Sequence, residues 1–337
     1  MTSKIRFAVI GTNFISDWVI AGARQDDRFE LKAIYSRSQQ TADAFAAKHN
    51  IPLTFTDLSE LARCKEVDAV YIASPNSFHA SQSILMMQHG KHVLCEKPLA
   101  SNAREAAIMI REAEKTGVTL MEAMKPTLTP NFQAVMAQLT AIGQVRQYFS
   151  SFCQYSSRYD RFRSGEQLNA FDPSLSSGAL VDVGVYTLYP LIVLFGKPQR
   201  VQASGTLLST GVDGAGAVVL DYPGFQATLL YSKISDAYLS TEIQGEEGTI
   251  SLDRINLIRE VKFYPRKFAT SGIGPGSEPI NISRSTTFND YYFEIREFID
   301  LIEQRRQQSE INSWQSSLIT MEVMDEVRRQ LGVKFVE

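Results

Sequence analysis

The chain has 337 residues, of which 44% are hydrophobic and 21% charged, a composition typical of a globular enzyme and not of a disordered or fibrous protein. Its formal net charge of −3 and its scattered basic residues exclude the charge pattern of a nucleic-acid-binding protein and of a membrane-surface patch. No run approaches the roughly 18 consecutive apolar residues of a membrane span, and the N-terminus lacks a signal-peptide layout. We therefore expect a cytoplasmic protein of two domains, with neither a nucleic-acid nor a membrane partner.

Three cysteines, Cys64, Cys95 and Cys153, are widely spaced and form no C-x-x-C motif. An odd number of isolated cysteines disfavours both a disulfide framework and structural zinc. We expect reduced thiols and no metal site.

Residues 1–123 alternate short apolar runs with helix-like segments. The predicted strands are 5–10, 31–35, 69–73, 92–95 and 119–122, and helical patterns lie between them, for example over 38–49 and 101–117. In the last of these helices, Ser101 or Asn102 is a suitable N-cap and Gly117 a suitable C-cap. This alternation predicts a first domain over 1–123 that consists of a parallel sheet with helices on both faces.

The pattern changes after residue 124, where strand-like runs follow one another through short turns. The predicted strands are 145–157, 200–209, 216–222, 225–232 and 239–245, and two helical patterns follow over 289–304 and 313–330. A Gly-, Pro- and Ser-rich stretch over 269–283 is predicted to be a surface loop. Consecutive strands without intervening helices predict a second domain over 124–337 of α+β type, with a largely antiparallel sheet.

The stretch GTNFIS, residues 11–16, lies between the first strand and a helix, where a dinucleotide-binding turn would have the sequence G-x-G-x-x-G. Only Gly11 matches, and it would supply the tight turn. Asn13 tolerates left-handed backbone angles, and Ser16 is small enough for helix–strand packing. Backbone amides from Gly11 to Phe14 and Ile15 would then face a pyrophosphate, although how Asn13 would meet it is open. An ordinary strand-to-helix turn is the alternative.

Ser36, Arg37 and Ser38 follow the second strand, where a protein that binds the ribose 2′-OH of NAD would have Asp or Glu. An arginine between two hydroxyl groups suits a 2′-phosphate, because it offers charge and several donors in one place. The sequence therefore predicts NADP as cofactor in preference to NAD. A solvated loop arginine is the alternative.

Ser74, Pro75, Asn76 and His79 follow the strand over 69–73. Ligands of open α/β sheets gather outside the carboxyl ends of the strands, so this loop is predicted to face the cofactor. His79 could equally begin a helix and make a structural hydrogen bond.

Two further motifs carry candidate catalytic residues. Glu96 and Lys97 follow the strand over 92–95, where a lysine beside a carboxylate can contact a substrate oxygen. Asp182 and Tyr186 are four residues apart and would share one face if their segment is helical. That pair could handle a proton, or it could belong to an ordinary amphipathic helix with an aspartate near its N-terminus.

In this order, the motifs GTNFIS, YSRS, SPNSFH, CEKP, LMEAMKP and GALVDVGVY resemble the Gfo/Idh/MocA family of NAD(P)-dependent oxidoreductases over nearly the whole chain. Within that family the chain looks most similar to the dimeric dihydrodiol dehydrogenase-like branch. The residues that suggest this branch are 120–123, 178–186, 210–224 and 245–252. The resemblance implies an N-terminal Rossmann domain followed by an α+β domain with a large, mainly antiparallel open sheet. It also implies association into homodimers or homotetramers through that sheet.

The resemblance implies a dehydrogenase or reductase that acts on CH–OH groups. Lys97 corresponds to the motif lysine that contacts both the substrate oxygen and the nicotinamide ribose, and Asp182 matches the aspartate that positions by hydrogen bonding. Tyr186 stands where most members have histidine, and it is the candidate acid/base. A phenol has a reference pKa of about 10, so a nearby Lys97 ammonium would have to stabilise its phenolate. The active site is expected in the cleft between the two domains.

Residues 124–128 replace an aromatic-rich stretch of the dihydrodiol-like branch, which argues against an aromatic dihydrodiol as substrate. A sugar, cyclitol, diol or small carbonyl compound is the expected substrate. Tyr155, Arg158, Tyr159 and Arg161 are candidates for substrate selection, or they are surface residues. A non-catalytic NADP-binding sensor and a glycosidase that uses bound NAD are the alternative functions.

Overall fold

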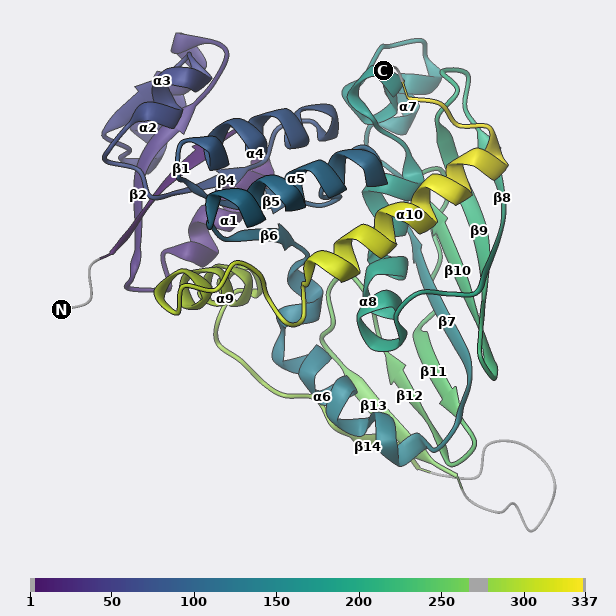
Figure 1. Ribbon diagram of the computed structural model, residues 1–337. Helices are drawn as coiled ribbons and strands as arrows, with labels where there is room; N and C mark the ends of the chain where they lie inside the picture. Colours follow the sequence, from purple (N-terminus) through teal and green to yellow (C-terminus); the bar gives the residue numbers. More distant parts are fainter. Residues whose placement is uncertain (1–3, 267–277, 336–337) are drawn as a thin grey trace. The chain divides into compact units, whose positions relative to one another are not determined.

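The computed structural model of the chain describes residues 4–266 and 278–335 (Figure 1). The chain divides into two compact units, the first comprising Met1–Lys125 with Thr287–Met321 and the second comprising Pro126–Thr286 with Glu322–Glu337. The sequence predicts one boundary at 123/124, whereas the chain returns to the first unit after residue 286. Residues 269–277 of the predicted loop lie outside the described residues.

The first unit contains a six-stranded, fully parallel sheet in the order β3-β2-β1-β4-β5-β6 (Figure 1). The strands are β1 (Ile5–Ile10), β2 (Phe29–Tyr35), β3 (Leu53–Phe55), β4 (Ala69–Ile72), β5 (His92–Glu96) and β6 (Leu120–Ala123). The five predicted strands are confirmed. The sequence did not predict β3, whose three residues are all only half-buried and give no run of apolar residues.

Helices cover the parallel sheet. They are α1 (Phe14–Ala23), α2 (Gln39–His49), α3 (Leu58–Arg63), η1 (Asn76–Phe78), α4 (His79–Gln88), α5 (Ala103–Thr116) and α9 (Asp290–Glu303). Asn102 caps α5 through Glu105 N–H, and Gly117 ends it at a φ of 76°, so both predicted caps are confirmed. α4 packs beside α5, and α1 beside α9.

The α1–α9 pair explains why residues 287–321 return to the first unit. A Cβ on Gly22 of α1 would lie 2.6 Å from the Cβ of Tyr291, so glycine lets the two helices approach closely. α9 buries Phe293, Phe298 and Ile299. α9 thus completes the cover of a sheet whose strands lie more than 160 residues earlier in the chain.

The second unit contains an eight-stranded sheet in the order β14-β13-β12-β11-β7-β10-β9-β8, antiparallel except for the pair β7–β10 (Figure 1). The strands are β7 (Val145–Cys153), β8 (Arg200–Leu207), β9 (Asp213–Tyr222), β10 (Phe225–Ser232), β11 (Thr241–Gly245), β12 (Gly248–Leu252), β13 (Val261–Pro265) and β14 (Ile280–Asn281). The predicted fold class is confirmed, and so are its five predicted strands. The sequence did not predict β12, β13 and β14.

The helical segments that follow the first unit's sheet are short, apart from two. They are η2 (Lys125–Leu128), α6 (Pro130–Gln138), η3 (Leu139–Ile142), α7 (Tyr159–Arg163), η4 (Asn169–Phe171), η5 (Pro173–Leu175), η6 (Leu180–Gly184), α8 (Val185–Phe195) and α10 (Trp314–Leu331). The helices predicted over 289–304 and 313–330 are confirmed as α9 and α10.

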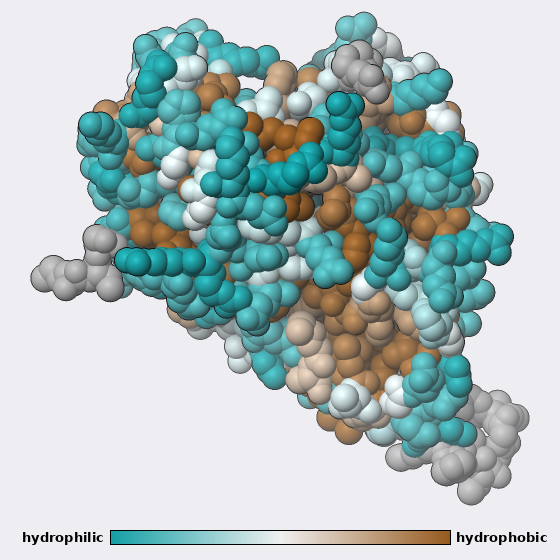
Figure 2. Space-filling view, viewed as in Figure 1, coloured by the Kyte–Doolittle hydropathy of each residue, from teal (hydrophilic) through white to brown (hydrophobic). Residues whose placement is uncertain are grey.

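The core of the second unit is centred on α8. The most apolar 18-residue window of the segment Pro173–Phe195 has a mean hydropathy of 1.8 and is apolar enough to cross a membrane by composition, but 72% of that window is buried inside the structure. Burial to this extent is the mark of a core helix. Hydrophobic residues gather over α6 and α8 in the space-filling view (Figure 2).

Candidate active site

The turn after β1 is shaped by a single glycine. Gly11 has a φ of 115°, and a Cβ there would lie 2.7 Å from the carbonyl oxygen of Ala73, which follows β4. A side chain at position 11 would therefore be strained and would clash with the backbone. Ser16 is fully buried, and its hydroxyl donates to the Gly11 carbonyl at 2.8 Å. These two residues keep the turn tight although the other two motif glycines are missing.

Asn13 differs from the expectation. Its φ of −84° and ψ of 173° are extended and not left-handed, because it is the N-cap of α1. Its Oδ1 accepts from the amides of Ile15 and Ser16 at 2.9 and 3.2 Å, and its Nδ2 donates to Ala73 O at 2.9 Å. Asn13 thus fixes the start of α1 to the end of β4. It also occupies two of the amides that would otherwise face a phosphate.

The segment after β2 is open to solvent. Ser36 N–H donates to Phe55 O at 3.1 Å, which continues the pairing of β2 with β3. Arg37 and Ser38 are exposed, and Ser38 is the N-cap of α2 through Thr41 N–H. Arg37 therefore lies at the carboxyl end of a parallel strand, next to the N-terminus of a helix, where an anionic group is favoured.

The loop after β4 is held in place from inside the protein. Ser74 Oγ donates to Gln82 Oε1 at 2.7 Å, while Pro75 and Asn76 are half-buried. His79 is only 1% exposed, and its ring nitrogens contact Pro98 O and Ser74 O, each at 2.9 Å. The sequence predicts His79 as a cofactor-binding residue, but its ring is buried and engaged with backbone. It supports the loop from within, as the first residue of α4.

Lys97 follows β5 next to a half-buried carboxylate. Glu96 accepts from the hydroxyl of the buried Tyr71, and Lys97 N–H donates to Glu96 Oε2 at 3.2 Å. Burial raises the pKa of Glu96, whereas the Lys97 ammonium and the Tyr71 hydroxyl oppose that rise. Lys97 is itself half-buried at the carboxyl edge of the sheet, and its ammonium lies near the Glu96 carboxyl group.

Two further buried carboxyl groups lie near Glu96. Glu294 of α9 is fully buried, and neither of its carboxyl oxygens has a hydrogen-bond partner among the described residues. Burial and the charge of Glu96 raise its pKa well above the usual value. Glu122 of β6 is 2% exposed, and its Oε1 accepts from Leu99 N–H at 3.0 Å. The sequence did not suggest Glu122 or Glu294, because carboxyl groups in strands and helices are usually at the surface.

Glu122 predicts a pH dependence of stability. Burial raises its pKa from 4.5 to about 7, against the opposing effects of Ser317 and Leu99 N–H. The folded protein therefore keeps a proton that the unfolded chain loses, so this contribution is full below pH 4.5 and is lost as the pH rises to about 7. The loss is on the order of 3 kcal/mol.

Urea unfolding at pH 5 and pH 8, in ~0.1 M salt, measures this loss. We expect Glu122→Gln to lose less stability than the unmodified protein over this interval, because glutamine does not titrate. Glu96 and Glu294 remain in both proteins, so the difference between them isolates Glu122. An equal loss in both proteins would show that Glu122 is ionised throughout the interval.

Asp182 lies on a π-helical turn, and Tyr186 lies just after it. In η6, Val185 N–H donates to Leu180 O, and α8 follows directly. Leu180 N–H donates to Asp213 Oδ2 at 2.6 Å, which anchors the start of the turn. π-helical turns are rare and occur frequently at functional sites.

The solvent exposure of this segment is selective. From Gly178 to Ile192 every residue is buried except Asp182 and Tyr186. The ring of Tyr186 makes an edge contact with Phe152 of β7, with centroids 5.6 Å apart. An acid and a phenol are thus the two partly exposed groups between Gly178 and Ile192.

The sequence missed a partner of Asp182. Lys233 directly follows β10, and its Nζ lies 2.6 Å from Asp182 Oδ2. Lys233 is 5% exposed, which is unusual for a lysine. The one signal in the sequence is a charged residue at the end of the apolar strand FQATLLYS.

The segment suggested for substrate selection is built on aromatic rings. Tyr155 and Tyr159 make an edge contact with centroids 5.5 Å apart, and the ring of Tyr159 lies 5.9 Å from that of Phe171. Arg158 is exposed, and Arg161 pairs with Glu166. The two tyrosines are therefore part of a cluster, whereas the two arginines lie at the surface.

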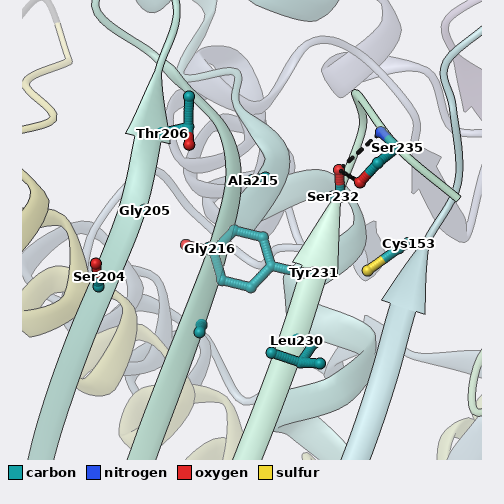
Figure 3. Close-up of a pocket in the computed structure, with 11 residues that line it drawn as sticks. Cys153, Ser204, Gly205, Thr206, Ala215, Gly216, Leu230, Tyr231, Ser232 and Ser235 are labelled. Atoms are coloured by element: carbon teal, nitrogen blue, oxygen red, sulfur yellow. Dashed lines mark hydrogen bonds between the residues drawn. The ribbon is translucent and has the colours of Figure 1, made fainter. Parts of the chain in front are cut away.

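A pocket of about 370 Å³ lies on the other face of the eight-stranded sheet (Figure 3). Ser204, Ala217 and Leu230 line it and are neighbours in register on β8, β9 and β10. The next residue of β10, Tyr231, points to the opposite face, where it meets Gly184 of η6. The pocket therefore opens away from Asp182 and Tyr186.

The structure thus forms two groups of predicted site residues. The first unit holds Gly11, Asn13, Arg37 and Lys97 on loops after parallel strands, and the second holds Asp182 with Tyr186. Among the described residues, no group of three or more His, Cys, Asp or Glu side chains could hold a metal ion, and the three cysteines form no disulfide.

Two family models match the chain. An oxidoreductase family with an NAD-binding Rossmann fold (GFO/IDH/MocA) matches residues 5–124, and the C-terminal domain of the same family matches residues 135–251. Together they cover most of both units.

Curated relatives extend over nearly the whole chain. The scyllo-inositol 2-dehydrogenase (NADP(+)) of Bacillus subtilis (strain 168) is 49% identical over 332 residues, which is 98% of each chain. The trans-1,2-dihydrobenzene-1,2-diol dehydrogenase of Danio rerio is 31% identical over 321 residues, covering 92% of this chain and 91% of that one.

A 3-ketoreductase from Actinomadura kijaniata, crystallised with NADP and TDP-benzene, has a similar structure. Its TM-score is 0.82 at 22% identity, with 99% of this chain and 100% of that chain covered. At this level of identity the likeness concerns the fold.

Proposed function

Because the chain belongs to the Gfo/Idh/MocA oxidoreductase family, we propose that it is an NADP-dependent oxidoreductase that acts on a CH–OH group of a cyclitol or sugar. The selective exposure of Asp182 and Tyr186 on a buried helix is the observation that carries the proposal. A proton-handling pair has no use in a protein that only senses NADP. The relative named as an NADP-dependent scyllo-inositol dehydrogenase supports the choice of substrate class and cofactor.

The residues present fit an NADP molecule. The Gly11 turn, where a Cβ would clash with Ala73 O, keeps the chain tight at the N-terminus of α1, where phosphates are favoured. The exposed Arg37, between Ser36 and Ser38, would hold the 2′-phosphate. Phe14 and Ile15, at the start of α1, and the loop Ser74–Asn76 after β4 complete the proposed binding surface.

When bound, NADP supplies the acceptor for the hydride that leaves the substrate carbon. We propose that the chain itself holds the substrate oxygen and moves one proton. Lys97 Nζ donates to that oxygen, and Asp182 orients the substrate by hydrogen bonding. Tyr186 Oη, as phenolate, takes the hydroxyl proton as the alcohol becomes a carbonyl, and it returns the proton in the reduction.

A substrate panel tests this function. The protein is incubated with NADP and scyllo-inositol, myo-inositol, D-glucose or a trans-dihydrodiol, and the absorbance of NADPH is followed. We expect turnover of at least one cyclitol or sugar, and none without the protein. NADPH binding without turnover of any member would favour the sensor, and cleavage of a glycoside without net NADPH formation would favour the glycosidase.

Asn13 allows the phosphate contact to be tested separately from folding. Asn13→Asp keeps the oxygen that caps α1 but adds a negative charge and removes the donor to Ala73 O, whereas Asn13→Ala removes the cap and the donor without adding a charge. We expect both variants to lose about 1–3 kcal/mol of stability, and only the aspartate variant to bind NADPH about 10-fold more weakly. Thermal unfolding and NADPH fluorescence titration measure the two effects. Unchanged affinity in Asn13→Asp would place the pyrophosphate away from this turn.

We propose further that the protein acts in the cytoplasm as a homodimer or homotetramer through its eight-stranded sheet. On the sheet face that carries the pocket, Phe149 and Leu230 are only half-buried. A second copy of the chain that packs on this face would bury them. Light scattering on the full chain would contradict this if it gave the mass of one chain.

A further inference from the structure

We infer that Lys233 is a positioning residue for Asp182, and that the two side chains act as one unit in turnover. The inference rests on the proposed function, in which Asp182 orients the substrate. Lys233 is assigned no contact with substrate or cofactor, so its effect passes through the carboxylate.

Lys233 is fixed at both its backbone and its side chain. Its N–H donates to Gly214 O, and its carbonyl accepts from Ser156 N–H, each at 2.9 Å. Its Nζ donates to Ala170 O at 3.3 Å and lies 4.9 Å from the centre of the Phe171 ring. These contacts join the end of β10 to the start of β9 and to the segment over 154–171. The ammonium therefore has little freedom to move.

The ion pair is asymmetric in its exposure. The Lys233 side chain is 6% exposed, whereas that of Asp182 is 48% exposed, with 2.6 Å between Nζ and Oδ2. A buried ammonium is costly unless an anion compensates for it, so Lys233 constrains where the Asp182 carboxylate can lie. The carboxylate still reaches solvent, and so it remains accessible to a substrate hydroxyl group.

A second anion near Lys233 is committed elsewhere. Asp213 is 2% exposed, and the charge of Lys233 helps to offset the rise in its pKa that burial causes. Its Oδ2 accepts from Leu180 N–H, and a Cβ on Gly178 would lie 2.3 Å from its Oδ1. Asp213 thus anchors the π-helical turn, while Asp182, on the same turn, takes the exposed side of the ammonium. Asp213 therefore fixes the turn that carries Asp182, and Lys233 fixes the Asp182 carboxylate itself.

The alternative is an ion pair that only stabilises the fold. Such a pair would change the stability of the protein when broken and leave kcat unaltered. A positioning pair would lower kcat more than it changes KM, because a misplaced carboxylate slows the chemical step in substrate that is already bound.

The test uses Lys233→Met, which keeps an unbranched side chain, removes the ammonium that lies over Phe171 and leaves behind a carboxylate that water can solvate. We expect kcat for the fastest cyclitol of the panel to fall roughly 10- to 100-fold, with KM and the NADPH dissociation constant within about threefold of the unmodified protein. Lys197→Met is the control, because Lys197 forms an ion pair of the same length, 2.6 Å, with Glu322 on the surface of the same unit. This control should keep full activity.

A double-mutant cycle separates the two roles. Asp182→Asn should already lose most of kcat, and adding Lys233→Met should lower it no further. Two outcomes would overturn the positioning role alone. In one, the reductions in kcat of the two single variants multiply in the double variant; in the other, Lys233→Met is fully active while Asp182→Asn is inactive. Full activity of Asp182→Asn would instead refute the part that the proposed function gives to Asp182, and the positioning role with it.

Lys233→Gln covers the case in which the methionine variant does not fold. Its amide still donates toward Asp182 without a charge, so kcat should lie between those of the methionine variant and the unmodified protein. If the glutamine variant is folded and turns over at the unmodified rate, the charge of Lys233 has no part in turnover.

Discussion

Replacing Lys97 with methionine is expected to reduce turnover by about 10²- to 10³-fold, the range observed when one hydrogen-bond donor to a reacting oxygen is removed. The reason is local. Lys97 follows β5 at the carboxyl edge of the parallel sheet, and it presents the ammonium that the proposed reaction uses on the substrate oxygen. Methionine keeps the length of the side chain and removes its charge. Because the predicted phosphate contacts lie on other loops, NADPH affinity should change no more than a few-fold.

Single-turnover and steady-state rates, together with NADPH fluorescence titration, measure this prediction. Lys115→Met is the matched control, since Lys115 is an exposed lysine near the end of α5 in the same unit, paired only loosely with Glu112 at 3.3 Å. We expect the control to behave as the unmodified protein. A fully active Lys97→Met enzyme would remove Lys97 from the reaction.

The second large effect is expected at Arg37. Arg37→Ala should weaken NADPH binding about 10- to 100-fold, because a hydrogen bond to a charged group contributes roughly 1.5–3 kcal/mol. NADH carries no 2′-phosphate, so its affinity should not change. The preference for NADPH over NADH should therefore disappear in this variant.

Arg63→Ala provides the comparison, since Arg63 is an exposed arginine at the end of α3 in the same unit. Titration of both cofactors against the three proteins gives the result. If the unmodified protein binds NADPH and NADH equally, Arg37 does not hold a phosphate. If Arg63→Ala weakens NADPH as much as Arg37→Ala, the effect is one of general charge.

Local signals explain which elements the sequence predicted. Asn102 and Gly117 delimit α5 because a cap and a left-handed terminus depend on a few adjacent residues. β3 and β12 lack such signals: β3 has three half-buried residues, and β12 depends on the pairing with β11 and β13. Pairing of this kind is a tertiary property.

The return of α9 to the first unit could not be predicted for a similar reason. It depends on the approach of Tyr291 to Gly22, two residues far apart in the sequence. An isolated glycine within α1 gives no indication of the helix that packs on it.

In the candidate site too, features that depend on adjacent residues were predicted and features that depend on tertiary contacts were not. Arg37, Lys97, Asp182 and Tyr186 were predicted because each belongs to a short motif at a recognisable place. The N-cap role of Asn13 was not predicted, because side-chain capping competes with a left-handed turn and the approach of Ala73 O is a tertiary contact. Lys233 was missed because its partner, Asp182, lies 51 residues away in the chain.

Transfer of a labelled hydride tests the central claim most directly. The protein is incubated with NADPH that carries deuterium at the transferable position of nicotinamide C4, together with the ketone form of the fastest cyclitol in the panel. Mass spectrometry then follows the alcohol that forms. We predict one deuterium on the carbon that bears the new hydroxyl group, in step with NADPH consumption, and labelled alcohol that forms about 10²- to 10³-fold more slowly with Lys97→Met. An alcohol without deuterium, or no alcohol with any cyclitol or sugar ketone, would contradict the assignment of this protein as an NADP-dependent oxidoreductase of cyclitols or sugars.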